Sequence, residues 1–517
     1  MRGLRPWALL LAVVLACVTG AWLGRARPVY TELLPGEPST LNPHLSVTAP
    51  VQTVGRFIYS SLTRVDPGGA ILPDLALTWE SGDGGRTWHF ELDPRAKWHD
   101  GRSLRPADVA FTLSTVTQPE CPGPWSGMWR IVAATVSGEH EVEVVLTEQR
   151  PLFPREVAAM PILPQHVLGL VPLRQWPQHQ ASSAPIGTGP FTLASRDKGR
   201  RLELKANPAY HLGQPGLETV TFIWKRVPAL SAKDVAGRAT AGALGRGPVW
   251  SVPKGYRLLP ASGPGFAFIA FSLAADVPFF QERGVRQAWV RASGRDEVMH
   301  RAAGIGVRPL DGPYLGEQGA PIRLASDPAA ARSLLERAGW RAKDRDGIMQ
   351  RDGVRFQATL EVLGQRSDFV AAARILARNL RQAGMDVTVK PISFERYLQV
   401  IGGSEPFHVL LGYWSVVPSL GIGALFHSTA STQAGGANFT GYASPVLDKI
   451  VWELDRVQPG VRRSELVAEC LGLMAVEVPY QFLWAVGEPF LVRDTLKGPQ
   501  PGPFDRYWNV HLWKLGG

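Results

Sequence analysis

His99 and Asp100 are adjacent, and an imidazole beside a carboxylate is a pairing used in general-base catalysis and in metal binding. The pair lies in the stretch AKWHDGRSLRPADVAFTL, residues 96–113. Before it, residues 87–92 (TWHFEL) alternate in polarity, which predicts a strand, and Asp100-Gly101 is a typical turn sequence. Adjacent strand residues point to opposite faces. We therefore expect structural roles for both residues at a hairpin end, with a catalytic dyad or metal corner as the alternative.

Motifs of common catalytic and nucleotide-binding sites are absent from the 517-residue sequence. It has no GxSxG, HExxH or Walker A pattern, and the GTGP segment at residues 187–190 runs into a strand-like FTL instead of a phosphate-binding helix. The eleven His are scattered, with His408 and His427 nearest the ligand crevice predicted below. The sequence therefore predicts a protein that is not an enzyme and that needs no metal and no cofactor.

The amino-acid composition narrows the class of protein further. Hydrophobic residues make up 45% and charged residues 19%, which is typical of a globular protein with large cores. The net charge is +10, but the chain has no long Lys/Arg run, so we expect no nucleic-acid partner. Of the three cysteines, Cys17 lies in the leader, which leaves Cys121 and Cys470 either as one disulfide or as two thiols.

Residues 1–27 have the pattern of an export signal. Arginines flank an uninterrupted apolar run at residues 7–23, which at 17 residues is shorter than the roughly 20 that a spanning helix needs. The VLAC segment resembles a bacterial lipobox and makes Cys17 a lipidation candidate. Three outcomes stay open: a lipoprotein at Cys17, an uncleaved membrane anchor, or cleavage near Ala21 or Ala26. Each places the rest of the chain outside the cytoplasmic membrane.

The second half of the chain has the pattern of a parallel α/β unit. Asp327-Pro328 predicts a helix start that Gly339 ends. Residues 356–364 read as a strand, residues 367–384 as a helix and residues 385–392 as a second strand. A strand, a helix and a strand within about 35 residues form a βαβ unit, which predicts a parallel sheet.

A further strand is predicted at residues 407–415 (FHVLLGYWS), after a short helix at residues 394–401. In open α/β sheets, ligands bind beyond the carboxyl ends of the strands. We therefore expect Tyr413, Trp414 and Ser415 at a ligand crevice. The alternative for Trp414 is simple packing against a neighbouring helix.

Several stretches together resemble the extracellular solute-binding protein family 5 of ABC importers, which includes oligopeptide-, dipeptide- and nickel-binding proteins. Residues 75–113 resemble its signature segment, with the Trp-His-Asp-Gly turn and the Ala-Asp-Val helix start. Residues 184–222 contain a GTGPF strand and an Asn-Pro-x-Tyr segment of the same kind. Residues 284–304 and 437–450 resemble two further blocks, and the resemblance runs in order from about residue 28 to the C-terminus.

The resemblance implies an α/β, two-lobed periplasmic-binding-protein-like fold (type II) with an extra β-rich subdomain in lobe one. Two crossing strands are expected near residues 260–271 and 481–490. The expected division is a signal peptide or membrane anchor at 1–27, lobe one at 28–71, 184–262 and 486–517, the β-rich subdomain at 72–183, and lobe two at 263–485.

The function implied by the resemblance is that of the substrate-binding component of an ABC importer. Such a protein encloses a peptide-like or other small solute between its lobes and delivers it to a membrane permease with its partner ATPase. We expect an exported monomer, periplasmic or at the cell surface, that contacts the membrane through its N-terminal segment. Residues 234–248 depart from the Gly-Glu-Ile-Asp-like helix that the family has at this place. This departure motivates the alternative of an exported sensory or scaffold protein. An exported hydrolase is a third hypothesis.

Three more ligand contacts are expected. The resemblance implies Asn438, in the family's Ala-Asn-Phe block, and we add Trp129, in a Trp-rich loop that can reach the cleft, and Tyr59 in lobe one. The alternatives are a capped loop residue for Asn438 and a packing aromatic for Trp129.

Peptide binders of the family carry an Asp shortly after the strand that ends here at Ser415, whereas residues 412–423 hold no acid. A buried ammonium without a partner charge is costly, so this departure favours an uncharged or anionic solute.

Overall fold

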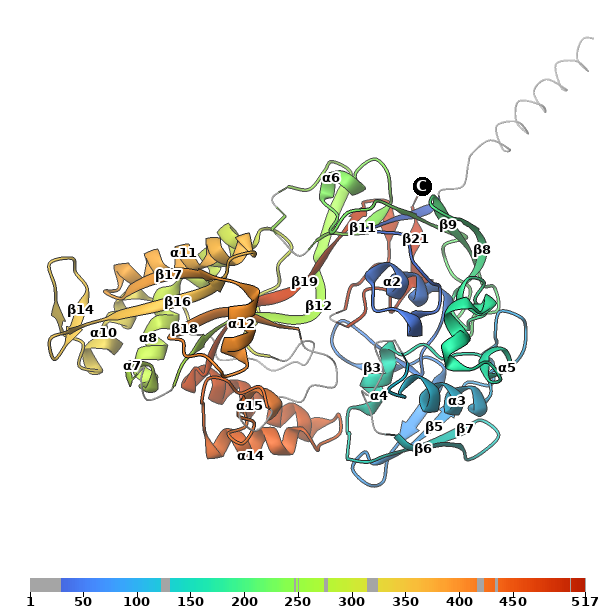
Figure 1. The fold of residues 1–517 in the computed structure, drawn as a ribbon, viewed down its shortest axis with the longest axis horizontal. Helices are drawn as coiled ribbons and strands as arrows, with labels where there is room; N and C mark the ends of the chain where they lie inside the picture. The colour runs from blue at the N-terminus through green and yellow to red at the C-terminus, as the bar shows by residue number, and fades with distance from the viewer. Residues whose placement is uncertain are drawn as a thin grey trace, which may run out of the picture.

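The computed structural model consists of two lobes joined near the centre of the molecule by two long strands, β12 (Tyr256–Phe271) and β19 (Tyr480–Arg493) (Figure 1). It describes residues 29–121, 131–245, 248–249, 251–273, 278–313, 324–415, 423–432, 436–502 and 504–516. Cys17, the leader and Trp129 lie outside these residues. The two-lobed α/β expectation is confirmed.

One sheet runs through both lobes, in the strand order β17-β16-β18-β12-β19-β11-β1-β10-β9-β8. The start of β12 pairs with the end of β19, from Tyr256 opposite Arg493 to Leu259 opposite Phe490. Further along, Phe266 lies opposite Ala485, and the register shifts between these two stretches. Such irregularities bend and twist a strand pair, so the sheet changes direction where it passes from one lobe to the other.

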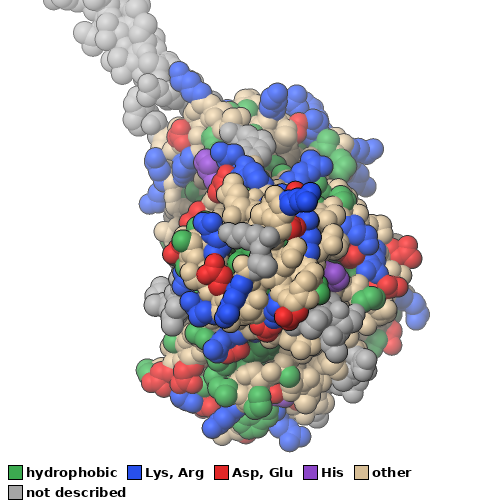
Figure 2. All heavy atoms as spheres, turned by 90° about the vertical axis from the view of Figure 1, so that its left-hand side faces the viewer, with side chains coloured by type: hydrophobic (Ala, Val, Ile, Leu, Met, Phe, Trp, Pro, Cys, Tyr) green, Lys and Arg blue, Asp and Glu red, His purple; other side chains and the backbone are tan. Residues whose placement is uncertain are grey.

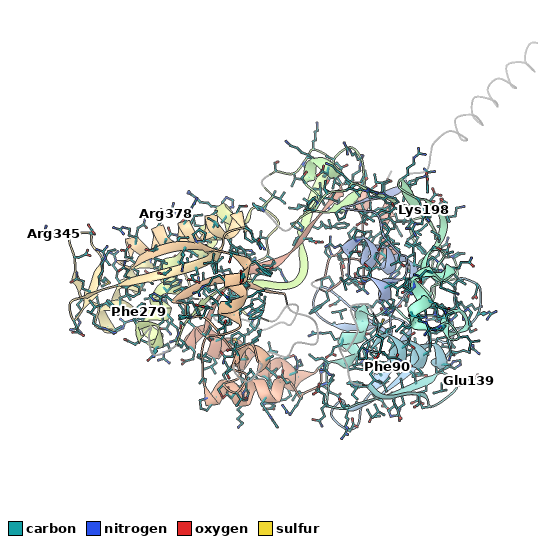
Figure 3. The ribbon with its side chains drawn as sticks, viewed as in Figure 1. Phe90, Glu139, Lys198, Phe279, Arg345 and Arg378 are labelled. Carbon is teal, nitrogen blue, oxygen red and sulfur yellow. The ribbon has the colours of Figure 1, made fainter. Side chains whose placement is uncertain are left out.

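Lobe one contains the remaining strands of this sheet and a separate antiparallel sheet of four. The shared sheet contributes β1 (Tyr30–Leu34), β8 (Phe191–Asp197), β9 (Arg201–Ala206), β10 (Thr219–Trp224) and β11 (Ala241–Ala243), beside helix α2 (Ala49–Ile58). The second sheet has the order β4 (Ala76–Glu80), β5 (Thr87–Leu92), β7 (Glu141–Leu146) and β6 (Ile131–Val136), next to α3 (Pro106–Val116). The expected alternation in β5 is confirmed, because Trp88, Phe90 (labelled in Figure 3) and Leu92 are all buried.

The Trp-His-Asp-Gly turn connects this second sheet to the GTGPF segment. The Nδ1 atom of His99 accepts the N–H of Gly187 at 3.2 Å, and its Nε2–H donates to the carbonyl of Gly189 at 3.1 Å. Asp100 turns away and accepts from His166 at 2.9 Å. Both ring nitrogens of His99 are thus occupied by backbone groups, so the structural expectation for the pair is confirmed and the dyad alternative is wrong.

Gly187 is required by close backbone contact. A Cβ at this position would lie 2.0 Å from the carbonyl oxygen of Ile58, the last residue of α2. We expect Gly187→Ala to lower the free energy of unfolding by about 2–3 kcal/mol, because α2 or the GTGPF segment must move. Gly472 in helix α15 (Val461–Glu477) is the control: a Cβ there meets nothing within 4 Å, so Gly472→Ala should raise stability by about 1 kcal/mol. Urea denaturation measures both, and equal effects would contradict the clash.

Lobe two is built on the expected βαβ unit. Strands β16 (Gln357–Leu363), β17 (Asp386–Ile392) and β18 (Val409–Ser415) are parallel, and α11 (Ser367–Gln382) connects the first two. Helix α12 (Phe394–Ile401) has the predicted bounds, and α10 (Pro328–Arg337) is capped by Asp327, which accepts from two N–H groups of its first turn. Two buried clusters cover the two faces of this part of the sheet. The longer helices of the lobe also include α8 (Arg283–Ser293), α14 (Pro445–Leu454) and α15.

The two cysteines of the body belong to different lobes. Cys121 is buried in the core of lobe one, and Cys470 in one of the two cores of lobe two. The structure records no bond between them, so the disulfide alternative is wrong. On the face of lobe two shown in Figure 2, basic and acidic side chains are interspersed, without a continuous basic stripe. In the described part of the chain, every helix is too short or too polar to span a bilayer.

Candidate functional site

The carboxyl ends of β16, β17 and β18 lie at one edge of the sheet, because the three strands are parallel. Helices α11 and α12 both begin just beyond this edge. The last residue of β18, Ser415, pairs with Gly265 of β12, where β12 leaves lobe two. In Figure 1, α12 accordingly lies on the side of lobe two that faces lobe one. This edge is therefore the part of lobe two that can contact a solute held between the lobes.

Four aromatic rings form a continuous row along this edge. Ring centroids are 6.3 Å apart for Phe394 and Tyr397, 6.2 Å for Tyr397 and Tyr413, and 6.0 Å for Tyr413 and Phe369. Phe394 is 46% exposed and Tyr413 is partly exposed, whereas Tyr397 and Phe369 are buried. We call these four residues the aromatic row. It offers flat apolar surface at the place where the sequence predicted a ligand crevice.

A guanidinium group lies over one end of the aromatic row. The Cζ atom of Arg366 is 4.2 Å from the ring centroid of Phe369 and 5.5 Å from that of Tyr413, which is cation–π geometry. Asp368 holds the same guanidinium through two hydrogen bonds, one of them 2.8 Å long. The edge therefore carries a positive group in a fixed position, with its charge balanced locally by Asp368.

The hydroxyl of Tyr397 fixes the end of β18. It donates to the carbonyl of Tyr413 at 2.8 Å and accepts the N–H of Tyr413 at 3.1 Å. The hydroxyl thus makes the two backbone hydrogen bonds that a neighbouring strand would otherwise make to Tyr413. Gly412 makes this approach possible, since a Cβ there would lie about 3 Å from both the Tyr397 ring and Phe268. Burial raises the pKa of Tyr397, which keeps the hydroxyl protonated. The Tyr397 hydroxyl thus fixes the backbone of Tyr413, and with it the position of the Tyr413 ring.

Trp414 points to the opposite face of the sheet from Tyr413, as strand alternation requires. Its ring stacks on Phe268, with centroids 6.2 Å apart, and meets Phe439 edge-on at 6.1 Å. Its indole N–H and the hydroxyl of Tyr480 are both buried, and neither makes a hydrogen bond of ordinary geometry. Trp414 is partly exposed, as Tyr413 is, and packs against a core of lobe two, on Phe268 of strand β12 and not on a helix. Ser415 contributes a backbone pairing to β12.

The other predicted contacts do not join the aromatic row. Asn438 is buried, and its amide donates to the carbonyls of His427 and Tyr442 at 3.2 and 2.8 Å while accepting from Thr440, which is the bracing of a loop. Tyr59 is 6% exposed in the core of lobe one, where burial raises its pKa. Trp129 lies outside the described residues.

Arg366, Phe369, Phe394 and Tyr397 were missed by the sequence analysis. All four lie within six residues of the carboxyl end of β16 or β17. The rule that selected Tyr413 after β18 would have found them if it had been applied to the two neighbouring strands.

In the described part of the chain, no three His, Cys, Asp or Glu side chains are grouped so that they could hold a metal ion. The two histidines nearest the predicted crevice have separate local partners. His408 accepts the N–H of Thr359 at 3.4 Å, and His427 is bonded to Thr429 at 2.9 Å.

The chain is similar to known proteins over most of its length. Residues 70–435 match the family model described as bacterial extracellular solute-binding proteins, family 5 middle. The oligopeptide-binding protein AppA of Bacillus subtilis (strain 168) is 23% identical over 499 residues, which cover 93% of this chain and 90% of AppA.

Solved structures with the same fold include MppA, a periplasmic murein tripeptide binding protein in an unliganded open form. Its TM-score is 0.79 at 18% identity, with 95% of this chain and 98% of MppA covered. NikZ from Campylobacter jejuni, in complex with Ni(L-His), has a TM-score of 0.64 at 20% identity, with 94% and 99% covered.

Proposed function

The chain belongs to family 5 of the bacterial extracellular solute-binding proteins, and from this premise we propose that it holds its solute against the aromatic row. It is the substrate-binding component of an ABC importer, which captures a peptide-like or other small solute between its lobes for a membrane permease. The observation that supports our site is the partly exposed ring of Tyr413, held by Tyr397 at the edge that faces lobe one. Sensory or scaffold use of the fold is not favoured.

We propose that the solute carries apolar or planar groups and lacks a cationic end at this site. The rings of Phe394 and Tyr413 offer stacking surface, and the carboxylate of Asp368 beside them is already paired with Arg366. Residues 412–423 contain no acid that could neutralise an ammonium group. Related proteins bind an oligopeptide, a murein tripeptide and Ni(L-His), so amino-acid-derived solutes with a blocked or distant amine suit this chain.

We propose that lobe one comprises residues 28–262 and 486–517, with the β-rich subdomain at 72–183, and lobe two residues 263–485. Core membership supports this division: one cluster runs from Tyr30 to Phe222 and returns at Phe490, while two others lie between Phe266 and Val486. Closure would then bend β12 and β19 at their register shifts. A solute drives closure only if it binds the closed form more tightly than the open form.

Family membership places the protein on the outer side of the cytoplasmic membrane, in the periplasm or at the cell surface. We propose further that residues 1–27 direct export and that lipidation of Cys17 or retention of the apolar run attaches the protein to the membrane. We propose a monomer that carries its solute without chemical change. Mass spectrometry of intact exported protein distinguishes a cleaved, a lipidated and a full-length N-terminus.

Tyr413→Ala should weaken solute binding by about tenfold or more, equivalent to about 1.4 kcal/mol, because it removes a central and partly exposed ring of the aromatic row. The solute is first identified by mass spectrometry of small molecules that co-purify with the protein, and affinity is then measured by calorimetry. Trp452→Ala is the matched control, since this 54% exposed aromatic of α14 lies outside the row. An unchanged affinity in Tyr413→Ala would remove the row from the site.

A further inference from the structure

Charge is distributed unevenly over lobe one. Residues 184–262, which include β8 to β11 and α6 (Ala232–Val235), contain twelve Lys and Arg but four Asp and Glu. The β-rich subdomain at residues 72–183 contains nine Lys and Arg against thirteen Asp and Glu. Figure 1 places β9, β11 and α6 at one end of lobe one and β5, β6 and β7 at the opposite end. Lobe one therefore has a basic end and an acidic end.

Strand β9 presents two bases on the outer face of the sheet. Leu202 and Leu204 of this strand are buried in the core of lobe one. The alternate residues Arg201 and Lys205 therefore lie on the opposite face, and both are exposed. Neither makes an ion pair within the described part of the chain. Glu203 lies between them on this face and is only partly exposed, so the strand keeps a surplus of positive charge.

The segment around α6 covers the same side of the sheet. Its apolar residues form a cluster with Leu33 of β1 and Ile223 of β10. Ile223 lies opposite Arg201 in the strand register, so the segment packs on the face that carries Arg201. Asp234, the one acid in residues 225–240, is paired with Lys225. Three further bases of this segment are exposed and make no ion pair with another described residue: Arg226, Lys233 and Arg238.

We call Arg201, Lys205, Arg226, Lys233 and Arg238 the basic surface. The chain enters lobe one beside it. Val29 is 45% exposed, and its carbonyl accepts from the hydroxyl of Thr240, two residues after Arg238, at 3.4 Å. On the other side, β10 pairs with β1 and β9 with β10, which places Lys205 two strands away from this same end of β1. Residues 1–27 are therefore connected to the body between Arg238 and Lys205.

We propose that the basic surface lies on the anionic phospholipid headgroups of the membrane. Exposed Lys and Arg side chains attract anionic lipid, and one apolar anchor holds a protein firmly when a basic patch acts with it. The acidic β-rich subdomain is repelled and points away from the bilayer. Lobe one is then the stationary lobe, and closure over the solute is a movement of lobe two. The inference rests on the proposed membrane attachment, because a tether before Val29 keeps the basic surface within reach of lipid.

Binding of the full-length protein to vesicles is measured by co-sedimentation. In about 50 mM NaCl, vesicles of equal parts phosphatidylglycerol and phosphatidylcholine should bind it at least about tenfold more tightly than vesicles of phosphatidylcholine alone. In about 500 mM NaCl most of this preference should vanish, because salt screens exposed charges. Equal binding to the two kinds of vesicle at low salt would refute the proposal.

The double variant Lys205→Glu/Arg238→Glu should lower the preference for phosphatidylglycerol by about tenfold or more, because each reversal replaces an attraction by a repulsion. Arg332→Glu/Arg374→Glu is the matched control. It makes the same change in net charge through two exposed arginines of α10 and α11 in lobe two, and it should keep most of the preference. An equal loss in the two double variants would reduce the effect to net charge and overturn the basic surface.

The same measurements separate this inference from the proposed membrane attachment. If residues 1–27 do not attach the protein, binding to phosphatidylcholine vesicles is absent, but the preference for phosphatidylglycerol and its loss in Lys205→Glu/Arg238→Glu remain. If the attachment holds and the basic surface does not contact lipid, both kinds of vesicle bind alike. Tighter binding of a double-stranded DNA oligonucleotide than of the anionic vesicles, at the same salt, would assign the surface to nucleic acid and contradict the proposal.

Discussion

Replacing Arg286 by alanine should lower the free energy of unfolding by about 3–5 kcal/mol. This side chain of α8 is 3% exposed, and its guanidinium donates to four backbone carbonyls. Two belong to Phe280 and Gln281, and two to Glu477 and Val478 at the end of α15. Val478 has a left-handed backbone, with φ at 51°, so Arg286 satisfies the carbonyls of the turn that connects α15 to β19. The loss should therefore loosen the start of a strand that joins the lobes.

Arg283→Ala is the matched control on the same helix. Arg283 is also paired with Glu477, at 3.0 Å, but through the side-chain carboxylate and not a backbone carbonyl, and 56% of the arginine side chain is accessible. Exposed ion pairs contribute about 0–1 kcal/mol. Arg286→Lys should fall between the two, because one ammonium cannot reach four carbonyls. Urea denaturation gives all three values, and a loss below about 1 kcal/mol in Arg286→Ala would contradict this role.

The protein should lose roughly 3 kcal/mol of stability through His99 alone as the pH falls from 6.5 to 4. Burial lowers the pKa of His99 from 6.5 to about 4, since its ring lies between the turn and the GTGPF segment. Between these two pH values the unfolded chain binds a proton that the folded chain does not, so the free energy of unfolding falls with pH. Above pH 6.5 both states are neutral and the effect vanishes.

His99→Gln isolates this contribution, because glutamine does not titrate. Stability is measured by denaturant unfolding at pH 7 and at pH 4.5, and the drop between them should be smaller in the variant. Burial also lowers the pKa values of His44 and His511 to about 4, so part of the acid sensitivity should remain. The same pH dependence in both proteins, or an NMR titration of His99 near pH 6.5, would refute the prediction.

The site depends on which side chains a strand end presents to the gap between the lobes. Tyr413 and Trp414 are equal candidates by position, but Tyr413 joins the aromatic row while Trp414 stacks on Phe268. Both rings are partly exposed, but the partners of Tyr413 come from α11 and α12, the helices that start at the same edge, whereas those of Trp414 lie on the other face of the sheet. This difference is why our proposed solute site is built on Tyr413.

The sequence by itself determined the secondary structure of several segments. The bounds of α12, the cap at Asp327 and the βαβ unit around α11 follow from side-chain periodicity and backbone preference within a few residues, and the structure agrees with them. The opposite directions of His99 and Asp100 follow from strand alternation in the same way. The family also follows from sequence, because its motifs are short segments in a set order.

Tertiary structure alone decided which neighbours the predicted residues contact. The stacking of Trp414 depends on Phe268 and Phe439, and the hydrogen bonds of the buried Asn438 depend on the path of its loop, neither of which local periodicity encodes. The placement of Cys121 and Cys470 in different cores is likewise decided by packing between segments more than 300 residues apart. Alternation tells which residues share a face, but packing against distant chain decides which face meets solvent.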